Sequence, residues 1–226
     1  MTRPVEAVVL DLGETLVDET AVWGWWADQL GVPRLTFFGA LGAIVADRRA
    51  HLDVFALVRP DLTLDDVAAL AGGVLESGRQ VGAQDLYPDA LPTLEALRRA
   101  GYRTAVMANQ PSTVDAFLAS LPVDQCGSSQ TWGVAKPDPA FFARVAEELA
   151  LPPQRVAYVG DRVDNDVLPA KAAGMLAVHL RRGPWGVVHA TWPQAAAADI
   201  RIDTLADLPA ALARGAATAP GGTPSP

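Results

Sequence analysis

Two aspartates stand directly after apolar runs that lie far apart in the sequence. Asp11 ends one run, and Asp161 follows another, with Asp166 close behind. Open α/β sheets build their sites at the carboxyl ends of their strands, so we expect these carboxylates to lie around one point. Clustered carboxylates repel one another unless a cation lies among them, and oxygen ligands favour a hard ion such as Mg²⁺. The sequence therefore predicts a magnesium site.

Two further polar side chains belong to the same predicted edge of the sheet. Lys136 lies in the stretch Val-Ala-Lys-Pro-Asp-Pro, at a transition from loop to helix, and Asn109 ends a third apolar run. We expect the Lys136 ammonium beside the carboxylates. There the ammonium and a metal ion together would neutralise a bound phosphate and keep the carboxylates ionised.

The elements that must position these residues alternate between short apolar runs and helical patterns. Apolar runs separated by helices indicate a parallel sheet buried on both faces, and such units wind right-handed into a three-layer sandwich. We therefore predict an α/β fold with a doubly wound parallel sheet, a Rossmann-like core. The predicted strands are Ala7–Leu12, Thr104–Ala108, Arg155–Val159 and Met175–Leu180, with a fainter one around Ile200–Ile202, and the predicted helices are Ala90–Ala100, Asp138–Ala150 and Asn165–Ala173.

The interval from Asp18 to Gln84 breaks this alternation, because it shows helical patterns and no strand pattern. The three patterns are Thr20–Leu30, Leu35–Ala50 and Leu64–Val81. Trp23 and Trp26 share a helix face, and we expect them to pack within this region rather than face a substrate. The predicted organisation is a core domain of residues 1–17 and 85–215, an inserted helical cap of residues 18–84, and a disordered tail of residues 216–226, which is rich in Ala, Gly, Pro and Thr.

Composition limits the classes of partner. The chain has 226 residues, half of them hydrophobic, and a formal net charge of −8, which would repel nucleic acid. Cys126 is the only cysteine, so no intramolecular disulfide can form. We see neither a signal segment nor an apolar stretch long enough to span a membrane. We expect a cytoplasmic protein that acts on a small molecule, and the sequence leaves its oligomeric state open.

Three motifs, in this order and with this strand context, resemble the haloacid dehalogenase-like (HAD) hydrolase superfamily, in the group with a helical cap inserted after the first strand. They are Asp11–Thr15 with Leu16, Lys136-Pro137-Asp138, and the block from Gly160-Asp161 to Asn165-Asp166. The resemblance covers Val5 to Leu212. It implies a Mg²⁺-dependent hydrolase that acts on a small phosphorylated metabolite through an aspartyl-phosphate intermediate.

The resemblance also implies a role for each residue of the predicted site. Asp11 would be the nucleophile, and Lys136 would orient both the nucleophile and the phosphate. The expected metal-binding residues are Asp11, Gly13 through its main-chain carbonyl, Asp161 and Asp166, and the expected substrate-binding residues are Thr15, Asn109 and Lys136.

Two positions depart from the phosphatase pattern of the family. Gly13 replaces a second aspartate that protonates the leaving group and then activates water, work worth about 10²–10⁴-fold in rate. Ala108 replaces a Ser or Thr that donates a hydrogen bond to the phosphate, and losing such a donor costs roughly 10²-fold. We therefore expect impaired acid–base catalysis and slow turnover of alkyl phosphates. Glu14 is the nearest carboxylate but is one position out of phase, which leaves a cap residue or the substrate as other proton sources.

Two alternatives stand beside the phosphatase. Family branches that cleave carbon–halogen or carbon–phosphorus bonds also lack the second aspartate. Against them, the block from Gly160 to Asp166 is typical of magnesium binding, and residues 18–84 contain no lysine for the Schiff base of phosphonate cleavage. The other alternative is a catalytically silent relative that binds a phosphorylated metabolite or a protein partner.

Overall fold

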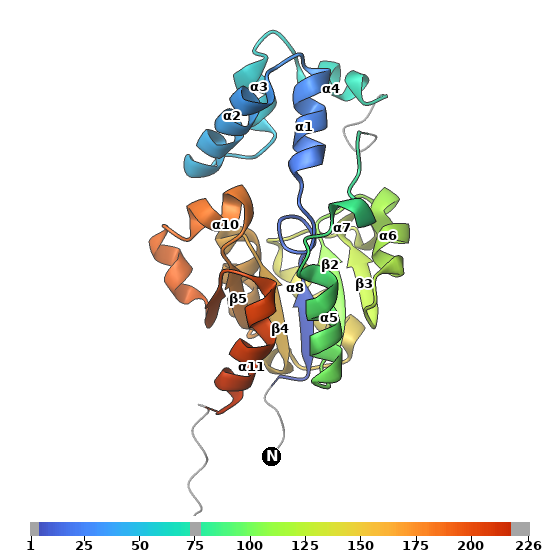
Figure 1. Ribbon diagram of the computed structural model, residues 1–226, viewed down its shortest axis with the longest axis vertical. Coiled ribbons are helices and arrows are strands. Elements are labelled where there is room, and N and C mark those ends of the chain that lie inside the picture. The colour runs from blue at the N-terminus through green and yellow to red at the C-terminus, as the bar shows by residue number, and fades with distance from the viewer. Residues whose placement is uncertain (1–4, 73–77, 218–226) are drawn as a thin grey trace, which may run out of the picture.

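A computed structural model describes residues 5–72 and 78–217 of the chain (Figure 1). Its strands form one six-stranded sheet in the order β3-β2-β1-β4-β5-β6, and every pairing between them is parallel. The strands are β1 (Ala7–Leu10), β2 (Arg103–Ala108), β3 (Gln125–Ser128), β4 (Val156–Gly160), β5 (Leu176–Leu180) and β6 (Ile200–Ile202). This confirms the predicted doubly wound α/β fold.

The order of the strands reverses between β1 and β4. The chain runs outward from β1 through β2 to β3, then returns to the other side of β1 and continues through β4 to β6. In the register of this pair, Leu10 lies opposite Val159, so Asp11 and Asp161 emerge from neighbouring strands at the same edge. Such a reversal leaves a crevice at the carboxyl ends of the two strands, the usual ligand site of an open α/β sheet.

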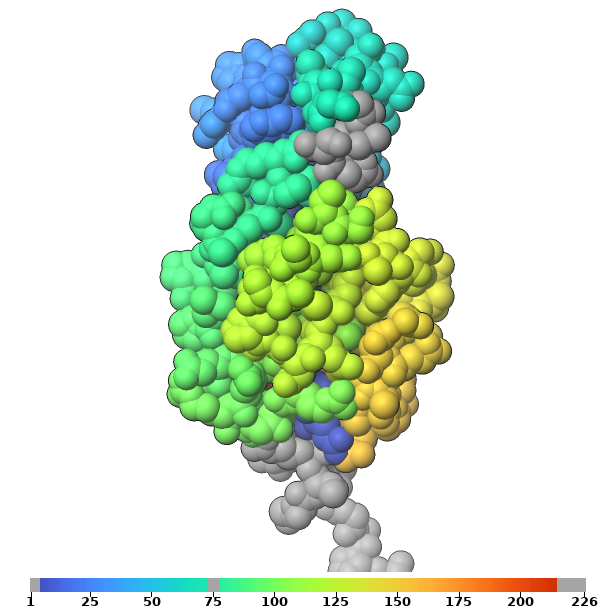
Figure 2. All heavy atoms as spheres, turned by 90° about the vertical axis from the view of Figure 1, so that its right-hand side faces the viewer, coloured from blue at the N-terminus to red at the C-terminus, as the bar shows by residue number. Residues whose placement is uncertain are grey.

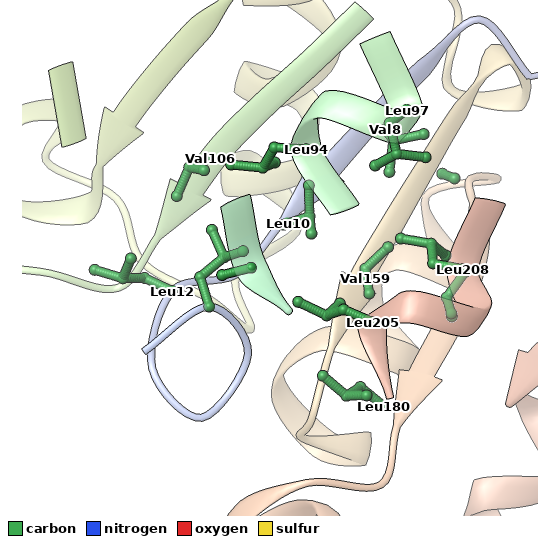
Figure 3. Close-up of a cluster of buried hydrophobic side chains, with 14 of the residues drawn as sticks. Val8, Leu10, Leu12, Leu94, Leu97, Val106, Val159, Leu180, Leu205 and Leu208 are labelled. Atoms are coloured by element: carbon green, nitrogen blue, oxygen red, sulfur yellow. The ribbon is translucent and has the colours of Figure 1, made fainter. Parts of the chain in front are cut away.

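Helices cover both faces of the sheet, because successive side chains of a strand point to opposite faces. Val8 and Leu10 pack on one face against Leu94 and Leu97, as Figure 3 shows, whereas Val9 packs on the other face. The helices of the core are α5 (Ala90–Arg99), α6 (Asp115–Ser120), α7 (Ser129–Trp132), α8 (Pro139–Leu149), α9 (Leu168–Ala172), α10 (Gly183–His189) and α11 (Leu208–Ala217).

Several core elements differ from the sequence prediction, among them a strand and two helices. Strand β3 is absent from it, because this edge strand has the sequence Gln-Cys-Gly-Ser and no apolar run to mark it. The helix predicted over Asn165–Ala173 begins earlier, with a π-helical turn over Val163–Val167 that leads into α9. Helix α11 extends through Ala217, so the first two residues of the predicted disordered tail are helical, while residues 218–226 lie outside the described residues.

The inserted segment forms a helical cap, which stands above the edge of the sheet where the site residues lie (Figures 1 and 2). Its side chains form a hydrophobic cluster of their own, which includes Trp26, Phe37 and Phe55 and also takes in Trp185 from α10. Its helices are α1 (Thr20–Gln29), α2 (Arg34–Ala46), α3 (Asp53–Val58) and α4 (Leu64–Leu70). The third predicted helix, Leu64–Val81, is therefore wrong in extent, since α4 ends at Leu70, and residues 73–77 lie outside the described residues.

The two segments that join cap and core run side by side. The main-chain N–H of Asp18 donates to the carbonyl of Asp85 at 2.8 Å, and that of Tyr87 donates to the carbonyl of Leu16 at 2.9 Å. The boundaries at residues 17/18 and 84/85 stay a prediction. Within the described ranges, no single helix is long and apolar enough to cross a membrane; α1 and α2 pass that test only as a pair, and they meet at a bend of 114°.

Candidate active site

A buried ammonium lies between two carboxylates at the end of β1. Lys136 Nζ is 2.8 Å from Oδ1 of Asp11 and 2.5 Å from Oδ1 of Asp166. The Lys136 side chain is only 1% exposed. These two carboxylates hold the pKa of Lys136 well above its usual value, although burial works against the charge. Lys136 is therefore a permanent cation of the site.

Asp161 completes a group of three carboxylates. Asp11, Asp161 and Asp166 each offer an oxygen atom, and these atoms all lie within 4.8 Å of one another. Burial and the neighbouring carboxylates raise the pKa of Asp161 well above its usual value, and burial raises that of Asp166 to about 6. Oδ2 of Asp161 is buried and has no hydrogen-bond partner within the described part of the chain. Three carboxylates beside one ammonium, with an unpartnered oxygen among them, form an oxygen-only donor set that fits Mg²⁺.

The main chain around these residues is fixed by polar side chains. Nδ2 of Asn109 donates to the carbonyl of Lys136, and Oδ1 of Asn109 accepts from the Lys136 N–H, both at 2.8 Å. Oδ2 of Asp166 accepts from the N–H of Arg162 at 2.9 Å, across the π-helical turn. Asn109 lines the cavity, but its amide is committed to positioning Lys136.

A cavity of about 240 Å³ opens above the carboxylates, between core and cap. From the core it is lined by Asp11, Gly13, Glu14, Asn109, Gln110, Lys136, Asp161, Arg162, Asn165 and Trp185, and from the cap side by Glu19, Trp23 and His51. The rings of Trp23, His51 and Trp185 meet with centroids 5.9–6.4 Å apart. Trp26 is buried in the cap, as expected; Trp23 packs against the hydrophobic cluster of the cap as well, but it also lines the cavity.

Like Asp166, Thr15 is a predicted site residue that does not line this cavity. Its side chain is fully buried, and Oγ1 has no hydrogen-bond partner among the described residues. Its carbonyl accepts a hydrogen bond from Arg182 at 3.0 Å. Because Thr15 is buried outside the cavity lining, the geometry favours a role in shaping the loop over contact with a substrate.

Glu14 lines the cavity, but both of its carboxylate oxygens accept hydrogen bonds. Its φ of 50° lies in the left-handed region, and its side chain is 4% exposed. Oε2 accepts from the Tyr87 hydroxyl at 2.6 Å, and Oε1 accepts from the main-chain N–H of Glu19 at 2.9 Å. Burial raises the pKa of Glu14, while these hydrogen bonds oppose the shift. Both carboxylate oxygens of Glu14 thus hold the loop and the start of the cap together.

Glu19 is a cavity residue that the sequence analysis missed. It stands immediately before α1 and is partly buried. A Cβ built on Gly13 would lie 2.5 Å from Oε1 of Glu19 and 2.9 Å from its Cδ. Burial, reinforced by Glu14, raises the pKa of Glu19 to about 8. In the sequence, only the position of Glu19 at the start of the cap could have pointed to a place in the cavity. That position does not distinguish Glu19 from any other residue that precedes a helix.

Comparison with known proteins agrees with this geometry. The sequence model of the haloacid dehalogenase-like hydrolase family matches residues 5–174. A glyceraldehyde 3-phosphate phosphatase of Methanopyrus kandleri is 32% identical over 44% of this chain and 45% of its own length. A plasmid-encoded phosphoglycolate phosphatase of Cupriavidus necator is 31% identical over 94% of this chain and 95% of its own length.

Similarity of fold extends across most of the chain. The crystal structure of a predicted phosphoglycolate phosphatase from Haemophilus somnus superposes with a TM-score of 0.69 at 21% identity, covering 92% of this chain and 98% of that one. The chain spans about half the length of the first relatives that it matches. Because the family model covers most of the core and all of the cap, the chain belongs to the haloacid dehalogenase-like hydrolase family.

Proposed function

We propose that this protein is a Mg²⁺-dependent phosphatase that acts on a small phosphorylated metabolite through an aspartyl-phosphate intermediate. The observation that carries the proposal is the pairing of Asp11 with Lys136 at a cavity that Asp161 also lines, with Asp166 buried against the same lysine. The relatives named as phosphatases of phosphoglycolate and glyceraldehyde 3-phosphate support the same class of substrate. A cavity of about 240 Å³ suits a substrate of that size.

Each residue of the site has a task in this reaction. Oδ2 of Asp11 attacks the phosphorus, because Oδ1 is held by Lys136 at 2.8 Å. Lys136 holds Asp11 in position through this contact and offsets the charge of the phosphoryl oxygens. Asp161 and Asp166, with Asp11 and the carbonyl of Gly13, would hold Mg²⁺, which supplies further charge neutralisation when bound.

The cap excludes bulk water from the intermediate. Trp23 and His51 from the cap and Trp185 from the core bring aromatic surface over the cavity. An acyl phosphate formed on Asp11 is thereby shielded from uncontrolled hydrolysis. Gly13 supplies no side chain for proton transfer, so slow turnover of alkyl phosphates is expected unless another group in the cavity provides the proton.

The test is phosphate release from acetyl phosphate and p-nitrophenyl phosphate in the presence of Mg²⁺. Asp11→Asn removes the nucleophile, and a chelator removes the metal, so each should abolish release. Asp203→Asn is the matched control, because Asp203 is 67% exposed and pairs with Arg181 outside the cavity. Its activity should equal that of the unsubstituted protein.

Metal binding is measured separately by thermal unfolding with and without Mg²⁺. Saturation at about 100 times Kd stabilises a folded protein by about 2.7 kcal/mol, and Asp161→Asn should remove that gain. Metal binding without release of phosphate from any substrate would contradict the phosphatase and favour the catalytically silent relative. Release of halide from a 2-haloacid, unaffected by the chelator, would favour carbon–halogen cleavage.

A further inference from the structure

The carboxylate of Glu19 fills the space that Gly13 leaves beside the nucleophile. An added Cβ at Gly13 would meet Oε1 of Glu19 at 2.5 Å, closer than nonbonded atoms approach. A side chain at position 13 would therefore require the carboxylate of Glu19 to leave its present place. Both Glu19 and Asp11 line the same cavity. The structure thus places a carboxyl group where the sequence lacks one, from a residue six positions further along the chain.

The side chain of Glu19 is not used to begin the helix that follows it. Glu19 is the residue before α1, yet its carboxylate makes no capping hydrogen bond to that helix. Asp18 supplies one instead, because its Oδ1 accepts from the N–H of Thr20 at 2.8 Å. Acidic residues are common at the start of a helix because their carboxylates cap free main-chain N–H groups. Since the carboxylate of Glu19 caps none, capping does not account for its orientation.

Two contacts fix Glu19 in its place. Its main-chain N–H donates to Oε1 of Glu14 at 2.9 Å, and Nε1 of Trp23 donates to Oε2 of Glu19 at 3.2 Å. With Oε2 held by the indole, Oε1 is the oxygen that lies toward Gly13. Glu14 itself is unsuited to proton transfer at Asp11, since its carboxylate faces Tyr87 and lies against Gly183.

We propose that Glu19 is the general acid and base of this enzyme and replaces the side chain that is absent at Gly13. The proposal rests on the proposed phosphatase function. As Oδ2 of Asp11 attacks, the bond from phosphorus to the ester oxygen breaks, and the proton of Glu19 passes to that oxygen, releasing the alcohol. Glu19, now a carboxylate, then takes a proton from water as the water oxygen attacks phosphorus. The bond from phosphorus to Asp11 breaks, which releases inorganic phosphate and restores both side chains.

The consequence depends on the leaving group. An alkoxide leaves poorly without a proton, whereas p-nitrophenolate needs none, so loss of Glu19 affects the first step only for alkyl esters. The second step uses the same water and the same base for every substrate. With p-nitrophenyl phosphate, removal of Glu19 should therefore leave the first step fast, slow the second, and allow the intermediate to accumulate.

The experiment compares Glu19→Gln with the unsubstituted Mg²⁺-loaded enzyme on p-nitrophenyl phosphate and on glycerol phosphate. We expect kcat/KM for glycerol phosphate to fall by about 10²–10⁴-fold. With p-nitrophenyl phosphate we expect a burst of p-nitrophenolate equal to the enzyme concentration, followed by slow steady turnover. Glu95→Gln is the matched control, because Glu95 is an exposed residue of α5 that pairs with Arg99, and it should leave both rates unchanged.

A second variant guards against misfolding of the first. Gly13→Asp combined with Glu19→Ala moves the carboxyl group from position 19 to position 13, where the clash with Glu19 is gone. It should regain at least tenfold of the glycerol phosphate activity that Glu19→Ala alone loses. Gly13→Asp in the presence of Glu19 should bring no gain, because the two side chains compete for one space.

Some outcomes would overturn the role of Glu19 while leaving the phosphatase intact. These are an equal loss on both substrates without a burst, no loss with Glu19→Gln, and no recovery in the double variant while Gly13→Asp alone is active. Failure of the proposed function looks different, because the unsubstituted enzyme would then release no phosphate from either ester.

Discussion

The Tyr87 hydroxyl donates a 2.6 Å hydrogen bond to Oε2 of Glu14, which lies 73 positions earlier in the chain. The contact joins the loop after the nucleophile to the segment that returns from the cap. Arg182 lies 4.2 Å from the centre of the Tyr87 ring and forms an ion pair with Asp89, so the tyrosine is held from its other side as well. Because the second oxygen of Glu14 binds the N–H of Glu19, this bond supports the start of the cap.

Tyr87→Phe should lower the free energy of unfolding by about 1–3 kcal/mol. The change leaves one oxygen of a buried carboxylate without its hydrogen bond, and such a group costs its desolvation energy. Urea unfolding measures the difference, and an unchanged m-value would show that both proteins expose the same surface on unfolding. If the midpoint does not move, the bond contributes nothing to the attachment of the cap.

Asn109→Ala should reduce kcat/KM for p-nitrophenyl phosphate by on the order of 10²-fold, because a misplacement of about 1 Å in a catalytic group has that effect. The Asn109 amide makes two hydrogen bonds to the main chain of Lys136 and positions its ammonium. Gln154→Ala is the control, since Gln154 is an exposed amide before β4, at the other end of the sheet. Equal kinetics for the two variants would contradict the positioning role.

Gly160→Ala should both destabilise the protein and impair phosphate release. An added Cβ would lie 2.3 Å from Cγ of Asp166, which must then shift away from Lys136. Overpacking of this kind costs about 1–3 kcal/mol.

Gly42→Ala in α2 should have the opposite effect on stability. An added Cβ at Gly42 meets no atom of the described residues within 4 Å, so the alanine should stabilise the helix by about 0.5–1 kcal/mol. Thermal unfolding of the two variants distinguishes overpacking at position 160 from stabilisation of the helix at position 42. If Gly160→Ala is as stable and as active as the unsubstituted protein, Asp166 has room to move.

His189 should make stability fall as the solution becomes acidic. The ring is buried against Trp192, and its Nδ1 accepts from the N–H of Val163 at 3.1 Å. Burial lowers the pKa of His189 to about 4, below the value of about 6.5 expected in the unfolded chain. Above pH 6.5 the His189 ring is neutral in both the folded and the unfolded protein, so its titration takes nothing from the free energy of unfolding. Between pH 6.5 and 4 the unfolded chain takes up a proton that the folded protein does not, so stability decreases by up to about 3 kcal/mol.

The measurement is urea unfolding of the unsubstituted protein and of His189→Asn between pH 7.5 and pH 4.5. An asparagine can still accept from the Val163 N–H but does not titrate, and the carboxylates are common to both proteins. The difference in unfolding free energy between the two should therefore shrink as the pH falls. Parallel curves would mean that His189 titrates alike in the folded and unfolded states.

Much of this protein was predictable from local patterns. The apolar runs before Asp11 and Asp161 placed both residues at the ends of buried strands, and the parallel order of those strands brought them together. Strand β3 was missed, because an edge strand with one covered face needs no apolar run. Helix α3 was missed as well, because six residues do not establish a helical period.

The sequence by itself determined the sheet, the cap and the identity of the carboxylates and the lysine, because burial of a parallel sheet requires apolar runs and places the residues after them at one edge. The tertiary structure alone decided which side chains enter the cavity. From the sequence alone, nothing distinguishes the glutamates Glu14 and Glu19 as possible proton donors. Both line the cavity, but hydrogen bonds from Tyr87 and from the N–H of Glu19 engage both carboxylate oxygens of Glu14, whereas Oε1 of Glu19 lies against Gly13. The bond from Tyr87 to Glu14 joins residues 73 positions apart, and no local pattern encodes it.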